Sequence, residues 1–223
     1  MKIDINNIKS IIFDMDGVIF DTELVYLEIW SKVFEKYGYK LQKEVYAEVL
    51  GTGRENVKKV FLNNYGNELP IDKMYREKDE DLEKAVDKGI PLKQGAYEIL
   101  SYLKNNNYKI ALATSASKER ALKQLRYADI EKFFDVIVSR DDVKETKPNP
   151  DIFLKEAKKL NVNPNECIVI EDSSAGIKAA FNAGMAGIHV VDLKEPDNEI
   201  IRNCYKSFNN LNDIRKEIEM LRG

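Results

Sequence analysis

The chain has 223 residues, 43% of them hydrophobic, and its 35 Lys and Arg residues against 38 Asp and Glu residues give a net charge of −3. This balance, without a basic block, gives no electrostatic footprint for nucleic acid, and no apolar run approaches the ~20 residues of a membrane helix. The N-terminal residues hold no apolar stretch of signal-peptide length. We therefore expect a cytoplasmic, monomeric protein that acts on small molecules, with no nucleic-acid or membrane partner.

The first predicted element is a buried strand over Ser10 to Phe13, which Asp14, Asp16 and Gly17 follow directly. One acid after a strand is weak evidence for function, because Asp also caps helices and starts turns. In an open parallel sheet, however, ligands collect beyond the carboxyl ends of the strands. The significance of this pair of acids therefore depends on which residues stand at the ends of the other strands.

A long helical insertion separates the first strand from the second. Asp14 and Lys109 are 95 positions apart (109 − 14), far more than one crossover helix needs. Helical patterns begin at Thr22 and recur as far as Val86, and Pro91 marks the return to the first domain. We predict that residues 21–90 form a helical cap domain, while residues 1–20 and 91–223 form the catalytic core.

After the insertion, short apolar runs alternate with amphipathic helical patterns. The predicted strands span residues 109–113, 135–138, 167–170 and 187–191, and the predicted helices between and before them cover residues 96–103, 120–127, 153–160 and 175–181. Short connections between strand, helix and strand imply right-handed crossovers. The fold class is therefore predicted to be α/β, with a doubly wound, Rossmann-like parallel sheet and an inserted helical cap.

Polar residues follow the later strands as well. Thr114 and Ser115 come after the second, Lys147 lies near the third, and Glu171 and Asp172 come after the fourth. Together with the two early acids, they make a coherent set for phosphoryl transfer through a carboxylate nucleophile and a hard cation.

The four segments FDMDGVIFDTE, LATS, KPNPD and IEDS resemble the four signature motifs of the haloacid dehalogenase superfamily. Their order and spacing are similar to the family pattern over nearly the whole chain. The helical insertion directly after the first motif resembles the group with a helical cap, which includes β-phosphoglucomutase and sugar-phosphate phosphatases. A single D-x-D would be weak evidence, whereas four motifs at the ends of separate strands are strong evidence.

The resemblance assigns the catalytic roles. It implies that Asp14 is the nucleophile that becomes an aspartyl phosphate and that Asp16 is the general acid and base. Thr114, Ser115 and Lys147 are implied to bind the phosphoryl group. Asp16 also argues against a dehalogenase, because halide leaves without a proton.

A magnesium ion is the implied cofactor. The resemblance places it on Asp14, the backbone carbonyl of Asp16, and Asp172, with Glu171 as a direct ligand or as support of one. Zinc is disfavoured, because the only histidine, His189, lies in an apolar run.

The cap residues offer two interpretations. The segment Gly51-Thr52-Gly53-Arg54 resembles a cap loop that presents a substrate-contacting arginine, and with Glu23, in the hinge after the first motif, Gly51 and Arg54 are assigned to substrate binding. The alternative is that Arg54 is a surface arginine at a helix start.

Three functions remain open at this point. The leading one is a Mg²⁺-dependent phosphatase for small phosphorylated metabolites, with sugar phosphates as the expected class. The second is an intramolecular phosphotransferase of the β-phosphoglucomutase kind, and the third is a non-enzymatic phospho-receiver, against which the inserted cap and the length argue.

Two cap positions bear on the choice between the first two functions. In β-phosphoglucomutase a cap histidine and a lysine before the cap-loop glycine take part in keeping water from the aspartyl phosphate, and Tyr26 and Leu50 stand at those positions here. Hydrolysis is therefore predicted over mutase activity.

Overall fold

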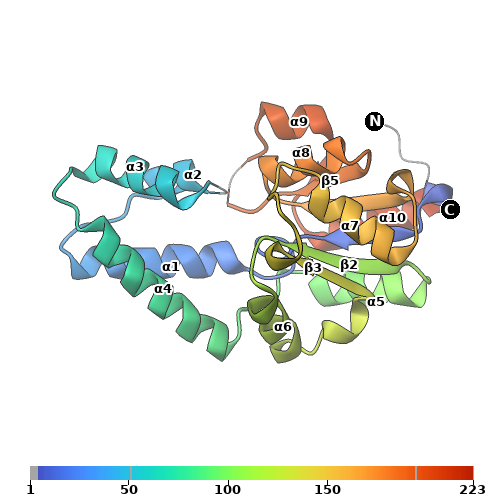
Figure 1. The fold of residues 1–223 in the computed structure, drawn as a ribbon, viewed down its shortest axis with the longest axis horizontal. Coiled ribbons are helices and arrows are strands. Elements are labelled where there is room, and N and C mark those ends of the chain that lie inside the picture. Colours follow the sequence, from blue (N-terminus) through green and yellow to red (C-terminus); the bar gives the residue numbers. More distant parts are fainter. Residues whose placement is uncertain (1–4, 51, 194, 223) are drawn as a thin grey trace. The chain divides into compact units, whose positions relative to one another are not determined.

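A computed structural model of the protein describes residues 5–50, 52–193 and 195–222. The chain divides into two compact units: the core unit, Met1–Asp21 with Pro91–Gly223, and the helical unit, Thr22–Ile90 (Figure 1). The sequence places the corresponding boundaries after residues 20 and 90. In the three described ranges, no helix is both long and apolar enough to cross a membrane.

The core unit is built on a six-stranded sheet with the order β3-β2-β1-β4-β5-β6, and every neighbouring pair is parallel. The strands are β1 (Ser10–Phe13), β2 (Lys109–Thr114), β3 (Val136–Ser139), β4 (Cys167–Glu171), β5 (Ala186–Val190) and β6 (Cys204–Phe208). The predicted α/β fold class is thereby confirmed. Strand β6 was not predicted, because this edge strand is only half-buried and contains Lys206 and Ser207 rather than a continuous apolar run.

Helices cover both faces of this sheet (Figure 1). They are α5 (Ala96–Asn105), α6 (Lys118–Tyr127), α7 (Asp151–Leu160), α8 (Ser174–Asn182), α9 (Asn198–Asn203) and α10 (Leu211–Arg222), with short 3₁₀ turns over Ile5–Asn7, Glu131–Phe133, Arg140–Asp142 and Pro164–Glu166. On one face, Ile12 and Val169 pack with Phe153 of α7 and Ala179 of α8 in one buried cluster. Because side chains alternate along a strand, Ile11 and its equivalents point to the opposite face, where α5 packs against β2 and α10.

The helical unit consists of α1 (Thr22–Lys36), α2 (Lys43–Val49), α3 (Arg54–Tyr65) and α4 (Ile71–Lys88). Its core is aromatic. The Trp30 ring meets Phe34, Phe61 and Tyr75 edge to face, with ring centroids 6.0, 5.2 and 4.9 Å away. Such pairs contribute about 0.5–1.5 kcal/mol each beyond the burial of their area. Trp30 and Phe34 therefore serve packing.

The two segments that flank the insertion run side by side within the core unit. The Asp21 amide donates to the Pro91 carbonyl at 2.9 Å, and the Lys93 amide donates to the Ile19 carbonyl at 2.9 Å. Between them, Phe20 and Leu92 form an antiparallel bridge. The chain consequently leaves and re-enters this unit at neighbouring points.

Candidate active site

Strand register brings the predicted site residues to one edge of the sheet. Phe13 at the end of β1 pairs with Leu112 on one side and with Ile170 on the other. Asp14 therefore follows its strand beside Glu171, which follows Ile170, while Thr114 ends the neighbouring strand β2. All three side chains are almost fully buried.

Lys147 joins the first and fourth motifs. Its ammonium group donates to Asp14 Oδ1, to Glu171 Oε1 at 2.7 Å and to the Ala113 carbonyl at 3.2 Å. Only 6% of the Lys147 side chain is exposed, so these charge-assisted bonds form largely out of water. The structure thus places Lys147 in direct contact with the predicted nucleophile.

Burial and Lys147 have opposite effects on the pKa values of Asp14 and Glu171. Burial raises the pKa of Asp14 to about 7 despite the opposing charge of Lys147. Burial also acts to raise the pKa of Glu171, but Lys147 and the Ser173 donors outweigh it and the pKa is lowered. For Lys147 itself, burial acts to lower the pKa, and the carboxylates of Asp14 and Glu171 reverse this so that the pKa lies above its usual range. The lysine is therefore held in its charged form.

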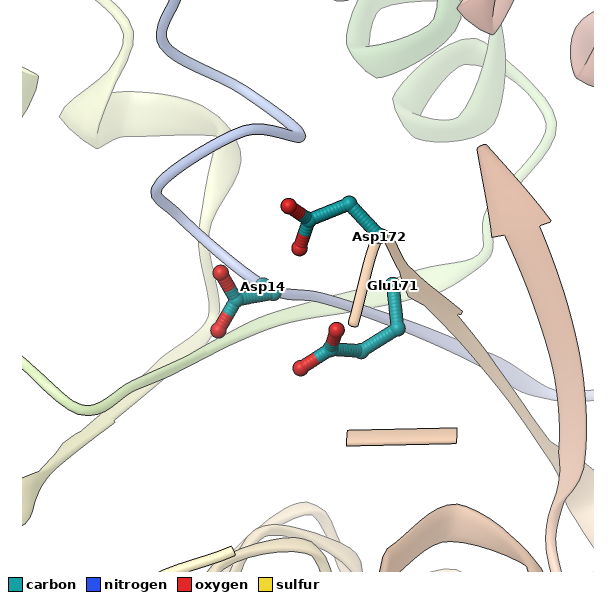
Figure 2. A group of neighbouring side chains, drawn as sticks. All are labelled: Asp14, Glu171 and Asp172. Atoms are coloured by element: carbon teal, nitrogen blue, oxygen red, sulfur yellow. The ribbon is translucent and has the colours of Figure 1, made fainter. Parts of the chain in front are cut away.

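Asp14, Glu171 and Asp172 form the acidic cluster of the site. Figure 2 shows their carboxylates turned to the same side, and each offers an oxygen within 4.8 Å of the others. Three carboxylates and one ammonium group leave two formal negative charges (−3 + 1 = −2). Hard carboxylate oxygens with surplus negative charge are the donors that Mg²⁺ prefers, so this set fits that ion.

Close packing fixes the Glu171 carboxylate. The Ser173 amide and hydroxyl donate to Glu171 Oε2 at 2.8 and 2.9 Å. A Cβ atom built on Gly176, in the first turn of α8, would lie only 1.8 Å from Glu171 Oε1. Residue 176 therefore has to be glycine for Glu171 to reach Lys147.

The turn after β1 carries Asp16 and Gly17. Gly17 has φ +75°, and a Cβ there would lie 2.3 Å from Asp172 Oδ2, so only glycine fits. Asp16 accepts a hydrogen bond at 2.6 Å from Arg120, on the helix that follows the second motif. Arg120 was not among the residues predicted from the sequence.

Thr114 and Ser115 differ in their surroundings. The Thr114 hydroxyl oxygen accepts from the Ala116 amide at 3.0 Å, which leaves its proton available for another acceptor. Ser115 is exposed, and Ser117 caps α6 by accepting from the Arg120 amide. The geometry suits donation to an anion from the Thr114 hydroxyl and the start of this helix.

A largely shielded ion pair, Lys93 with Asp192, lies near this edge and was missed in the sequence. Asp192, just beyond β5, accepts from Lys93, and its buried Oδ2 has no hydrogen-bond partner among the described residues. A Cβ atom built on Gly17 would lie 3.2 Å from this Asp192 oxygen and 2.3 Å from Asp172 Oδ2, so both carboxylates lie beside Gly17. A search for polar residues after the fifth strand, as after the others, could have found it.

His189 supports the fourth motif from β5. Its Nε2 lies 3.1 Å from the Asp172 carbonyl oxygen and its Nδ1 lies 3.1 Å from Ser207 Oγ. Because a carbonyl only accepts, the proton belongs on Nε2 and Ser207 donates to Nδ1. Burial lowers the pKa of His189, which favours this neutral ring. Both nitrogens are thus engaged in protein contacts.

The predicted substrate-binding residues belong to the helical unit. Arg54 begins α3, and its guanidinium lies 4.3 Å from the Tyr75 ring centroid and 3.5 Å from Asp79. Glu23 accepts from the Tyr46 hydroxyl at 3.3 Å. Gly51 lies outside the described residues. The assignment of these three residues to substrate binding stays a prediction.

Comparison with known proteins gives consistent matches. Residues 11–190 match the family model described as haloacid dehalogenase-like hydrolase. The phosphorylated carbohydrates phosphatase of Thermotoga maritima is 34% identical over 183 residues, which cover 82% of this chain and 85% of that protein. β-Phosphoglucomutase of Bacillus subtilis is 35% identical over 190 residues, covering 82% and 83%.

A solved structure extends the likeness to the fold. The putative β-phosphoglucomutase from Thermotoga maritima superposes with a TM-score of 0.79 at 29% identity, and the match covers 96% of this chain and 99% of that one.

Proposed function

We propose that this chain, which belongs to the haloacid dehalogenase-like hydrolase family, is a phosphatase of phosphorylated carbohydrates. In this proposal the reaction passes through an aspartyl phosphate on Asp14. The observation that carries this proposal is the buried contact between Asp14 and Lys147 beside the acidic cluster. A carboxylate held by a fixed cation, next to donors for an anion, is suited to attack on a phosphate ester.

The reaction divides into two displacements. In the first, an Asp14 oxygen forms a bond to phosphorus, the bond from phosphorus to the alcohol oxygen breaks, and Asp16 gives that oxygen a proton. In the second, Asp16 takes a proton from water, whose oxygen attacks phosphorus and releases Asp14 and inorganic phosphate. Lys147 balances charge on Asp14 and on the phosphoryl oxygens, while Thr114 and Ser115 donate hydrogen bonds to them.

Magnesium is the cofactor that this donor set fits. The ion would be held by Asp14, Asp172 and the carbonyl oxygen of Asp16. Glu171 would either bind the ion directly or orient one of the residues that bind it. Mg²⁺ bound there would supply positive charge that balances the phosphoryl oxygens.

We expect removal of divalent cations to abolish phosphate release and added Mg²⁺ to restore it. A ligand that binds only the folded state stabilises that state, by about 2.7 kcal/mol at a concentration of 100 Kd, so Mg²⁺ should also raise the melting temperature. Asp172→Asn should lose this thermal shift, while Asp213→Asn, which changes a carboxylate on α10, should keep it. Full activity in excess chelator would contradict the metal assignment.

Hydrolysis is proposed over transfer to a second hydroxyl. The relatives include both named activities, so the choice rests on Tyr26 and Leu50, which lack the cationic groups expected to restrain water in a mutase. Tyr26 is half-buried, with the Lys78 ammonium 5.5 Å from its ring centroid.

A phosphate-release screen over phosphorylated sugars, polyols and glycolate tests the proposal. Incubation with β-glucose 1-phosphate and a trace of the 1,6-bisphosphate should yield free phosphate; accumulation of glucose 6-phosphate with little phosphate would favour the mutase.

Arg54 is proposed to recognise the alcohol part of the substrate. Arg54→Ala is expected to lower kcat/KM for the best sugar phosphate about tenfold, the value of one charged hydrogen bond, with little change for 4-nitrophenyl phosphate. Lys58→Ala is the matched control, because Lys58 lies on the same helix and pairs with Asp72 at 2.6 Å. Equal losses on both esters would show that Arg54 does not contact the alcohol.

A further inference from the structure

Arg120 links the first two motifs. Its Nη2 donates to Asp16 Oδ1 at 2.6 Å, across a sequence separation of 104 residues. Asp16 lies in the turn after β1 and Arg120 lies in the first turn of α6, which follows the neighbouring strand β2, so the pair joins these two segments at the carboxyl edge of the sheet. Both side chains are largely shielded, with 21% and 25% of their surfaces exposed. A charge-assisted bond of this length in partial burial fixes geometry better than an exposed pair does.

Helix stability does not account for an arginine at this position. Arg120 is the third residue of α6, three positions after the N-cap Ser117. A cation in the first turn opposes the helix dipole, at a cost of about 0.3–1 kcal/mol, and this position favours Glu or Gln in a capping box. Arg126, in the last turn of the same helix, follows the favourable pattern and pairs with Glu131 at 2.7 Å. The Arg120 side chain is thus better explained by Asp16 than by its own helix.

We propose that Arg120 is a positioning residue that orients the Asp16 carboxyl group for proton transfer to the departing alcohol. The inference rests on the proposed function, in which Asp16 gives that proton. A planar guanidinium bonded to one carboxyl oxygen restricts rotation of the group about its side-chain torsions. Arg120 acts through Asp16 and leaves the phosphoryl group to Lys147 and Thr114.

The proposal predicts a dependence on the leaving group. Phenyl phosphate and 4-nitrophenyl phosphate have nearly the same shape, but phenol is a much weaker acid than 4-nitrophenol. Phenolate therefore requires a proton as it leaves, whereas 4-nitrophenolate departs without one. Since kcat/KM covers only the steps up to departure of the alcohol, the later hydrolysis of the aspartyl phosphate does not enter the comparison.

The test measures kcat/KM of Arg120→Met on both esters. We expect a loss of about tenfold or more on phenyl phosphate, because a displaced group transfers protons poorly, and a loss of less than about threefold on 4-nitrophenyl phosphate. Arg126→Met, which removes an arginine from the same helix, should change neither value. Asp16→Asn should show the same selectivity with a larger loss, and adding Arg120→Met to it should cost little more, because the two residues act as one unit.

Thermal melts establish that each variant is folded, and Arg120→Lys, which keeps the charge but not the planar group, serves if Arg120→Met is unstable. Equal losses on the two esters would overturn the inference and assign Arg120 to the shared phosphoryl group. No loss on either ester would overturn it as well. If Asp16→Asn itself affects both esters equally, the proposed acid role of Asp16 fails, which is a separate result.

Discussion

Asp14→Asn is expected to reduce phosphate release by at least ~10³-fold without loss of the fold, because the amide retains the shape of the carboxylate but not its nucleophilicity. Burial raises the pKa of Asp14 to about 7, which means that its surroundings disfavour the charged form. Replacing it by a neutral amide therefore removes a cost, and Lys147 keeps its bond to Glu171. The melting temperature in excess chelator should be unchanged or higher.

The measurement is single-turnover phosphate release alongside a thermal melt of each protein. Acid quenching with radiolabelled substrate should trap labelled protein for the parent and none for Asp14→Asn. Activity within about tenfold of the parent would remove Asp14 from the role of nucleophile.

Lys147→Met is expected to abolish activity and to destabilise the protein. The change leaves the Asp14 and Glu171 carboxylates buried without their cation, and breaking a buried pair in this way costs about 3–5 kcal/mol. The free energy of unfolding should therefore fall by that order in urea titrations with chelator present, so that no divalent cation substitutes for the lysine.

A second variant separates the two effects. Combining Lys147→Met with Glu171→Gln removes one of the stranded charges, so part of the lost stability should return while activity stays absent. Lys9→Met is the control for loss of a lysine ion pair, since Lys9 is exposed and pairs with Glu166. A stable Lys147→Met protein would show that the lysine does not offset the buried acids.

Much of the core unit could be predicted because parallel topology determines which strand ends converge. Once β1, β2 and β4 were located, Asp14, Thr114 and Glu171 had to lie at one edge, whatever their rotamers. Lys147 was found from its motif, although its contact with both acids depends on the loop that follows β3.

The contacts that were missed join residues on elements that topology alone does not orient. Arg120 belongs to the polar face of an amphipathic helix, where sequence patterns do not distinguish a solvated arginine from one that reaches Asp16. The pair of Lys93 and Asp192 depends on a turn after β5 that no apolar pattern marks. Strand β6 was missed for a related reason, since an edge strand needs no continuous apolar run.

The bridged segments around Phe20 and Leu92 bear on how this protein architecture diversifies. Because Asp21 and Pro91 are one hydrogen bond apart, residues 22–90 interrupt the core at a single point, and a short turn between those two residues would preserve every hydrogen bond of the sheet. Insertions of very different length can therefore be exchanged at this point during evolution without altering the register that sets Asp14 beside Glu171. With Arg54 in its proposed role, substrate choice and phosphoryl chemistry would then be separately heritable parts of one chain.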